Sequence, residues 1–140
     1  MCVRCAFDAQ VEFERRTLEN CIEWCNDNGT CVYCGEPEEH REHVVPRHTG
    51  LPTFVVPACA ECNLVAGGNV FPGIIEKQEF IRDRIKKRYG KLLRMPEWDD
   101  QEISELKGRL RRHVEGCSIA AKWVKSRLAW EMTSVASVDA

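Results

Sequence analysis

Residues 31–35 read CVYCG and residues 59–63 read CAECN, so two pairs of cysteines frame the middle of the chain. Two cysteines separated by two residues can present their thiolates to one tetrahedral ion from a tight turn, and two such turns complete a four-sulfur zinc site. Since four sulfurs leave no open coordination position, we expect this site to be structural and to contribute to folding. The predicted ligands of this Zn2+ ion are Cys31, Cys34, Cys59 and Cys62.

The composition predicts a small protein of the cytoplasm. The chain has 140 residues, of which 44% are hydrophobic and 30% are charged, and this suits one compact domain. It contains no run of about 18 apolar residues that would span a membrane, and residues 1–10 lack the layout of a secretory signal. The nine cysteines are therefore expected to be reduced thiols or metal ligands rather than disulfides.

A second zinc site is one of two interpretations of the N-terminal cysteines. Cys21 and Cys25 lie one helical turn apart within a helix that we expect near residues 10–27, which ends at Asn28-Gly29. With Cys2 and Cys5 from a folded-back terminus, they would complete another four-sulfur set. In the alternative interpretation, Cys21 and Cys25 belong to the buried face of the helix and bind nothing.

Two further long helical stretches are predicted after the cysteine pairs. The first covers about residues 72–94 and ends at Met95-Pro96. Asp99, with Glu102 three residues later, resembles a capping arrangement that opens the next. We expect Gly116 to form a turn and residues 119–132 to form a last helix, so that the C-terminal part is an antiparallel helical hairpin that serves as core or as a homodimer surface.

Between the cysteine pairs, the residue types required for phosphodiester hydrolysis occur close together. Short β-branched runs at 44–45 and 54–56 predict a small hairpin, and Glu42-His43 directly precede the first run. Glu42 and Asn63 offer hard oxygen ligands for Mg2+ or Mn2+, and His43 offers a base that titrates near neutral pH. In an extended strand Glu42 and His43 would point to opposite faces, so one site needs a bend or an ion at the strand end.

These residues carry a resemblance to a known family. Cys31-x2-Cys34, Glu42-His43-Val44-Val45-Pro46 and Val56-Pro57-Ala58-Cys59-x2-Cys62-Asn63 resemble the HNH endonuclease motif, in particular the zinc-knuckle subgroup that includes phage recombination endonuclease VII. The resemblance implies a ββα-metal fold that holds one catalytic Mg2+-type ion and cleaves DNA. It implies that His43 is the general base, that Glu42 and Asn63 bind the ion, and that the protein is phage-encoded and acts in the host cytoplasm.

The match covers about residues 31–63 and departs from the family pattern at three places. Glu42 stands where the family usually has Asp, Thr53 lies in the region of the usual middle asparagine, and the lysine that often follows the last cysteine pair is absent. The rival prediction is therefore a zinc-knuckle module that binds DNA or a protein without hydrolysis. A third reading is an adaptor or inhibitor that docks through its helices.

The charge distribution points to where DNA would bind. The net charge of -2 divides into -7 over residues 1–76, +7 over residues 77–127 and -2 over residues 128–140. A basic face on the helix at 72–94 suits the phosphate backbone, although a charged helix face is also typical of ordinary solvated surfaces. His40 and His48 either hold the phosphate or the metal, or are exposed loop histidines. Arg47 either neutralises the scissile phosphate or the zinc thiolates, or is solvated. The predicted DNA-binding residues are Arg47, Lys77, Arg84, Lys87, Lys91 and Arg94.

Together these predictions describe an α+β protein. A small zinc-stabilised ββα-metal centre is flanked by an N-terminal helix and a C-terminal helical hairpin. The expected segments are an N-terminal helical segment (1–30), the zinc-knuckle centre (31–70), a helical region with a basic face (71–134) and a flexible tail (135–140).

Overall fold

The computed structural model describes residues 18–132, and the predictions for the N-terminal cysteines Cys2 and Cys5 and for the tail lie outside the described residues. Residues 18–28 are helical, and the named elements that follow are listed in chain order. They are β1 (His40–His43), η1 (Arg47–Thr49), β2 (Val55–Ala58), α2 (Ala60–Ala66), α3 (Ile74–Arg88), α4 (Gly90–Leu93), α5 (Asp100–Glu105) and α6 (Gly108–Ala129).

The predicted hairpin forms between the cysteine pairs. β1 and β2 pair in antiparallel fashion, with Glu42 opposite Val56 and His43 opposite Val55, and in the described part of the chain they make one two-stranded sheet. The hydroxyl of Thr53 accepts a hydrogen bond of 2.9 Å from the backbone N–H of Val45, which fastens the loop that joins the strands. The first strand lies earlier than predicted, because it ends at His43 before the valine run begins.

A short helix continues directly from the hairpin. Cys59 is the N-cap of α2, and its sulfur accepts a hydrogen bond from the backbone N–H of Cys62 at 3.4 Å. This capping is stabilising because the first N–H groups of a helix have no partner within the helix. The second cysteine pair is therefore fixed by the start of a helix, and residues 40–66 form a hairpin followed by a helix.

The C-terminal half differs from the predicted helical hairpin. The capping box of Asp99 and Glu102 is confirmed, but it opens only the short α5. The chain leaves the helix at Leu106 and Lys107, and α6 begins at Gly108, whose φ of 62° lies in the left-handed region. From there α6 runs unbroken through Gly116. Gly116 was wrongly predicted to be a turn. A glycine inside a helix costs only about 1 kcal/mol, which the packing of a 22-residue helix easily offsets.

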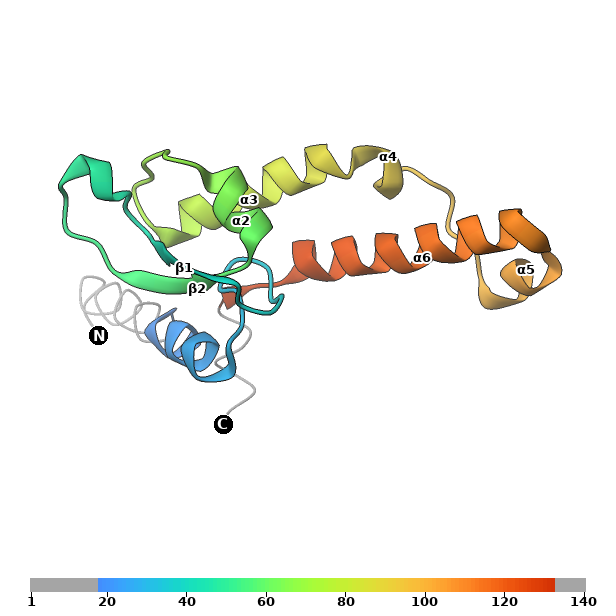
Figure 1. Ribbon diagram of the computed structural model, residues 1–140, viewed down its shortest axis with the longest axis horizontal. Coiled ribbons are helices and arrows are strands. Elements are labelled where there is room, and N and C mark those ends of the chain that lie inside the picture. The colour runs from blue at the N-terminus through green and yellow to red at the C-terminus, as the bar shows by residue number, and fades with distance from the viewer. Residues whose placement is uncertain (1–17, 133–140) are drawn as a thin grey trace, which may run out of the picture.

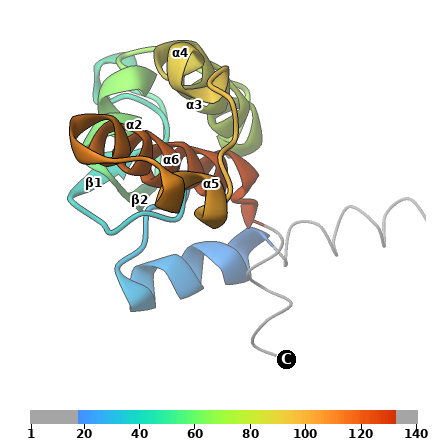
Figure 2. The ribbon, with the colours of Figure 1, turned by 90° about the vertical axis from the view of Figure 1, so that its right-hand side faces the viewer.

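Two long helical segments lie side by side in opposite directions. α3 and α4 lead away from the hairpin, and α6 returns toward it (Figure 1). The expected helix at 72–94 is thus present from Ile74, with a break at Tyr89. Figure 2 shows residues 18–28 on the opposite side of the hairpin from α3 and α4. None of the helices in residues 18–132 combines the length and apolar character needed to cross a membrane.

The main core surrounds the cysteines. It joins the four cysteines of the two pairs with Cys21 and Cys25 from the N-terminal helix, the hairpin residue Val56, and Ile81 and Ile85 from α3. Near its C-terminal end, α6 adds Val124 to this cluster. The element boundaries and the core together place the cysteine pairs at the point where the N-terminal helix, the hairpin, α3 and α6 meet.

Candidate metal centre and the predicted catalytic residues

The two cysteine pairs come together as predicted. The sulfurs of Cys31, Cys34, Cys59 and Cys62 all lie within 4.8 Å of one another, and all four residues are buried. Cys34 Sγ and Cys59 Sγ are 3.6 Å apart. A zinc ion with bonds of about 2.3 Å to sulfur, arranged as a tetrahedron, separates its sulfurs by about 3.8 Å. This four-cysteine cluster can therefore hold a metal ion such as zinc.

The electrostatics of the cluster also favour a cation. Hydrogen bonds among the crowded thiols raise the pKa of Cys31 and Cys62 and lower the pKa of Cys59, because the four sulfurs compete for protons. Each additional thiolate makes the next ionisation more costly in a buried site. A divalent ion removes this cost because it replaces the protons, which is how thiolate sites couple metal binding to proton release.

The first knuckle, residues 31–35, is covered by the end of α6. Gly35 has a φ of 81°, and a Cβ atom there would lie 2.5 Å from Cε3 of Trp130. The indole N–H of Trp130 donates a 3.0 Å hydrogen bond to the carbonyl of Val32. The side-chain amide of Gln78 donates to the carbonyl of Tyr33 at 3.2 Å, so α3 holds the same knuckle. Glycine is therefore required at position 35 both by the turn and by the ring.

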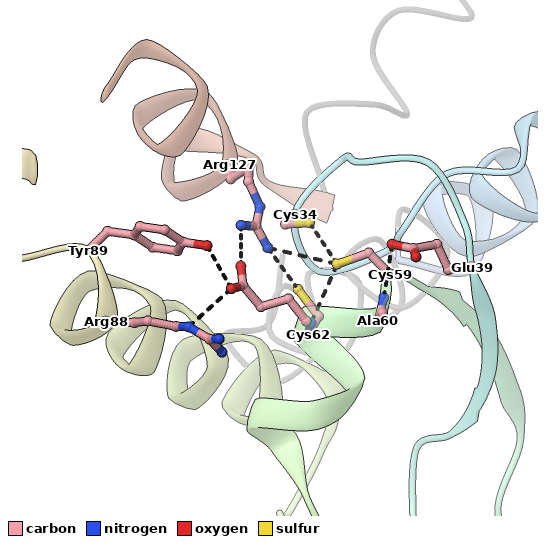
Figure 3. Close-up of polar contacts among 9 residues, drawn as sticks. Cys34, Glu39, Cys59, Ala60, Cys62, Arg88, Tyr89 and Arg127 are labelled. Carbon is pink, nitrogen blue, oxygen red and sulfur yellow. Dashed lines mark hydrogen bonds and ion pairs between the residues drawn. The ribbon is translucent and has the colours of Figure 1, made fainter. Parts of the chain in front are cut away.

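The second knuckle, residues 59–62, contacts α6 through a buried arginine. The guanidinium of Arg127 places Nη2 at 3.8 Å from the sulfurs of Cys59 and Cys62, while Nη1 pairs with Glu61 (Figure 3). The hydroxyl of Tyr89 donates to Glu61 at 2.7 Å, and Arg88 lies 3.3 Å from the same carboxylate. Desolvation acts to lower the pKa of Arg127, but the hydrogen bond to Glu61 and the cysteine charges outweigh it and raise the pKa.

The predicted magnesium ligand Glu42 already has a cationic partner. Its Oε1 is 2.6 Å from Nζ of Lys77, and the side chains are 6% and 1% exposed, respectively. The ammonium of Lys77 also donates to the carbonyls of His43 at 3.3 Å and Val44 at 3.0 Å. Burial and the nearby charge of Glu42 raise the pKa of Tyr33. Lys77 was predicted to lie on the DNA-binding face, and this was wrong, because its ammonium points into the protein.

The other two predicted catalytic residues lie on the same hairpin-and-helix unit. His43 ends β1, and its Nδ1 atom is buried without a hydrogen-bond partner among residues 18–132. The second carboxylate oxygen of Glu42, Oε2, is likewise unpartnered within that range. Asn63 lies in the first turn of α2, directly after the last cysteine, and its backbone N–H donates to the carbonyl of Cys59.

The remaining predicted contact residues are exposed. His40 opens β1, Arg47 and His48 belong to η1, and all three side chains are solvent-accessible. The ring of His48 lies close to Gly68, where a Cβ atom would be 3.4 Å from its Cε1. On α3 and α4, four predicted DNA-binding residues are exposed, as expected. These residues are Arg84, Lys87, Lys91 and Arg94.

The second zinc site, with Cys2, Cys5, Cys21 and Cys25 as ligands, remains a prediction, because Cys2 and Cys5 lie outside the described residues. Cys21 and Cys25 are both fully buried beside Leu18 and Ile22, in agreement with the helix face that either interpretation requires. A hydrogen bond between their thiols lowers the pKa of Cys21 and raises that of Cys25.

Sequence reasoning did not find Arg127, Trp130 or the inward direction of Lys77. Arg127 follows Cys62 by 65 residues, and no local spacing links them. The one available signal was that Trp123, Arg127 and Trp130 lie close together in the sequence near the end of α6. No family model, curated protein or solved structure matches this chain.

Proposed function

We propose that this protein is a DNA-binding module whose hairpin and α2 are held by a structural zinc at the four-cysteine cluster. The observation that carries the proposal is the cationic segment, residues 84–94, which contains six basic residues and no acidic residue. All six are exposed, and they are Arg84, Lys86, Lys87, Arg88, Lys91 and Arg94. Such a surface suits the phosphate backbone rather than the base edges.

Local ion pairs neutralise only part of this segment. Lys87 pairs with Asp83 at 3.2 Å and Arg88 with Glu61 at 3.3 Å. Arg84 packs over the ring of Phe80, and in residues 18–132 neither Lys91 nor Arg94 has an acidic partner. Basic residues in the last turn of a helix also offset its dipole, but that effect needs only one or two charges. The positive charge that is left without an acidic partner on this segment supports an anionic partner.

The hairpin lies within reach of a duplex bound along this segment. Lys77, which contacts the end of β1, precedes Arg88 at the end of α3 by about three helical turns, or about 17 Å at about 1.5 Å per residue. That length corresponds to about five base pairs of DNA. A duplex along α3 and α4 would therefore extend to the strand end that carries His43.

Hydrolysis of the bound DNA is the second candidate function. It is favoured by the unpartnered Glu42 Oε2 and His43 Nδ1 atoms at the end of β1, and by the resemblance to HNH endonucleases. In that mechanism His43 would take a proton from water, and Glu42 and Asn63 would hold a Mg2+ or Mn2+ ion that stabilises charge on the phosphate. The buried Lys77 ammonium opposes it, because a divalent ion at Glu42 would have to displace or share that partner.

Fluorescence anisotropy with a labelled DNA duplex tests the binding proposal. We expect affinity to fall steeply between about 50 and about 200 mM salt. The double variant Lys91→Gln with Arg94→Gln should bind more weakly and lower the salt slope by about 2. The matched control, Gln101→Glu with Ser104→Glu, changes the net charge equally on α5 and should bind like wild type. Equal losses in both double variants, or no binding by wild type, would refute the proposal.

A plasmid-nicking assay in Mg2+ or Mn2+ separates the two candidates. A pure binding module leaves plasmid, branched and single-stranded DNA intact. If wild type nicks DNA, and His43→Ala abolishes nicking with zinc content and DNA affinity unchanged, the protein is a nuclease rather than a pure binding module.

A further inference from the structure

Arg127 of α6 reaches the sulfurs of the four-cysteine cluster with its side chain. Its side chain is 1% exposed, although the residues on either side of it in α6, Ser126 and Leu128, are exposed or half-buried. The guanidinium uses its two terminal nitrogens differently, since Nη1 pairs with Glu61 and Nη2 lies 3.8 Å from both Cys59 Sγ and Cys62 Sγ. One nitrogen is thus directed at two sulfurs of the second knuckle.

An ordinary ion pair with Glu61 does not account for this arrangement. Glu61 already accepts a hydrogen bond from Tyr89 and lies beside Arg88, so its charge is compensated without Arg127. The guanidinium also lies over the Trp123 ring, whose centroid is 4.7 Å from Cζ. A rigid planar group with N–H donors on two edges can serve a carboxylate and two thiolates at once, which a lysine ammonium on a flexible stem does less well.

The negative charge of a zinc-loaded cluster also favours a cation beside the sulfurs. Four thiolates around a divalent zinc ion leave a net charge of -2 in a buried site, and burial of uncompensated charge is costly. Backbone N–H groups at the knuckles compensate part of it, and Cys62 N–H donates to Cys59 Sγ. Arg127 is the full positive charge that lies in contact with the sulfurs in the described part of the chain.

The end of α6 contacts both knuckles. Trp130, three residues after Arg127, donates to Val32 and covers Gly35 on the first knuckle. The carbonyl of Trp130 accepts a 2.7 Å hydrogen bond from Arg82 on α3. The end of α6 is therefore attached to the cluster through one contact that depends on sulfur charge and several that do not.

We propose that Arg127 is an outer-sphere partner of the zinc thiolates, and that its contact with Cys59 and Cys62 couples zinc occupancy to the docking of α6. The inference rests on the zinc site proposed above and is independent of DNA binding. Outer-sphere partners that donate hydrogen bonds to metal ligands change metal affinity by about 10- to 100-fold. By linkage, the same coupling favours the docked α6 whenever zinc is bound.

The test uses the full chain loaded with Zn2+, or with Co2+ as a coloured probe. Zinc affinity is measured by competition with a chelator, and the sulfur-to-cobalt charge-transfer band reports the electron density at sulfur. Arg127→Met should bind zinc about 10- to 100-fold more weakly. It should also move the band to longer wavelength, because loss of the N–H donors raises the energy of the sulfur lone pairs.

Two variants provide matched controls. Arg88→Gln removes the other arginine at Glu61 without touching sulfur, and it should leave both measurements at the wild-type values. Glu61→Gln tests whether Arg127 acts only through its carboxylate partner, and the cobalt band should remain in place in this variant. If Arg127→Met does not fold, Arg127→Lys retains the charge and should give an intermediate shift of the band.

Hydrogen exchange of the loaded proteins gives a readout of docking. The amides of residues 124–129 should exchange faster in Arg127→Met than in Arg88→Gln. Equal zinc affinity, equal band position and equal exchange in these two variants would overturn the role of Arg127. If wild type itself binds neither Zn2+ nor Co2+, the proposed zinc site is refuted. This outcome differs from the one that refutes the role of Arg127 alone.

Discussion

Two regions of this molecule contain metal-type ligands, and they differ in the source of the positive charge. At the four-cysteine cluster, four sulfurs lie within 4.8 Å of one another, and Arg127, the cation that contacts them in residues 18–132, cannot balance their charge. At the end of β1, the carboxylate of Glu42 has the ammonium of Lys77 at 2.6 Å. The difference shows how to rank candidate metal sites. A buried set of anionic ligands needs an added ion only where the chain itself does not provide the compensating charge.

Of the changes that test this difference between the two regions, removal of the metal should affect the fold most. A chelator strong enough to strip the cluster should unfold residues 31–62, because zinc binding contributes most of the folding free energy in small thiolate sites. We expect one equivalent of zinc by elemental analysis and loss of dispersed amide signals in NMR spectra after stripping. Cys62→Ser should behave like the stripped protein, whereas Cys117→Ser, at a half-buried cysteine outside the cluster, should not.

The Lys77–Glu42 pair should give the next largest effect. Lys77→Met leaves a buried carboxylate without its cation, and we expect a loss of about 3–5 kcal/mol in the free energy of unfolding, measured in urea. Glu42→Gln combined with Lys77→Met removes both charges and should recover most of that loss. Stability that is unchanged in Lys77→Met would mean that this ammonium does not compensate Glu42, and the contrast with the cysteine cluster would then disappear.

The sequence predicted local features of both regions and missed the residues that distinguish them. The knuckles, the hairpin and the capping box of Asp99 depend on spacings of a few residues, so they can be recognised without a structure. Lys77 and Arg127 act on partners that lie more than 30 residues away in the chain. A basic residue on a helix wheel cannot reveal whether it faces solvent or a buried anion. The misplaced turn at Gly116 has a similar cause, because α6 packs against α4, and that contact joins segments that are separate in the sequence.

A pair of glycine variants isolates the contact between the first knuckle and α6. Gly35 and Gly50 both have positive φ, at 81° and 69°, so alanine should cost about 1–2 kcal/mol at either position. At Gly35 the new Cβ would also meet the Trp130 ring, whereas at Gly50 nothing lies within 4 Å. We expect Gly35→Ala to lose more stability than Gly50→Ala in urea unfolding. Equal losses would show that Trp130 does not press on the knuckle.

The last prediction concerns Mn2+, which should leave the NMR signals around Glu42 unchanged in the wild-type protein. A paramagnetic ion held by Glu42 and Asn63 would broaden the amide signals of His43 and Asn63 in NMR spectra of the zinc-loaded chain. Because Lys77 already compensates Glu42, we expect no selective broadening in wild type. In Lys77→Met the freed carboxylate should attract the ion and broaden these signals, and Glu42→Gln with Lys77→Met should abolish the broadening. Selective broadening in wild type would place a divalent ion beside the ammonium, and the hydrolytic candidate would then become the better account of this hairpin.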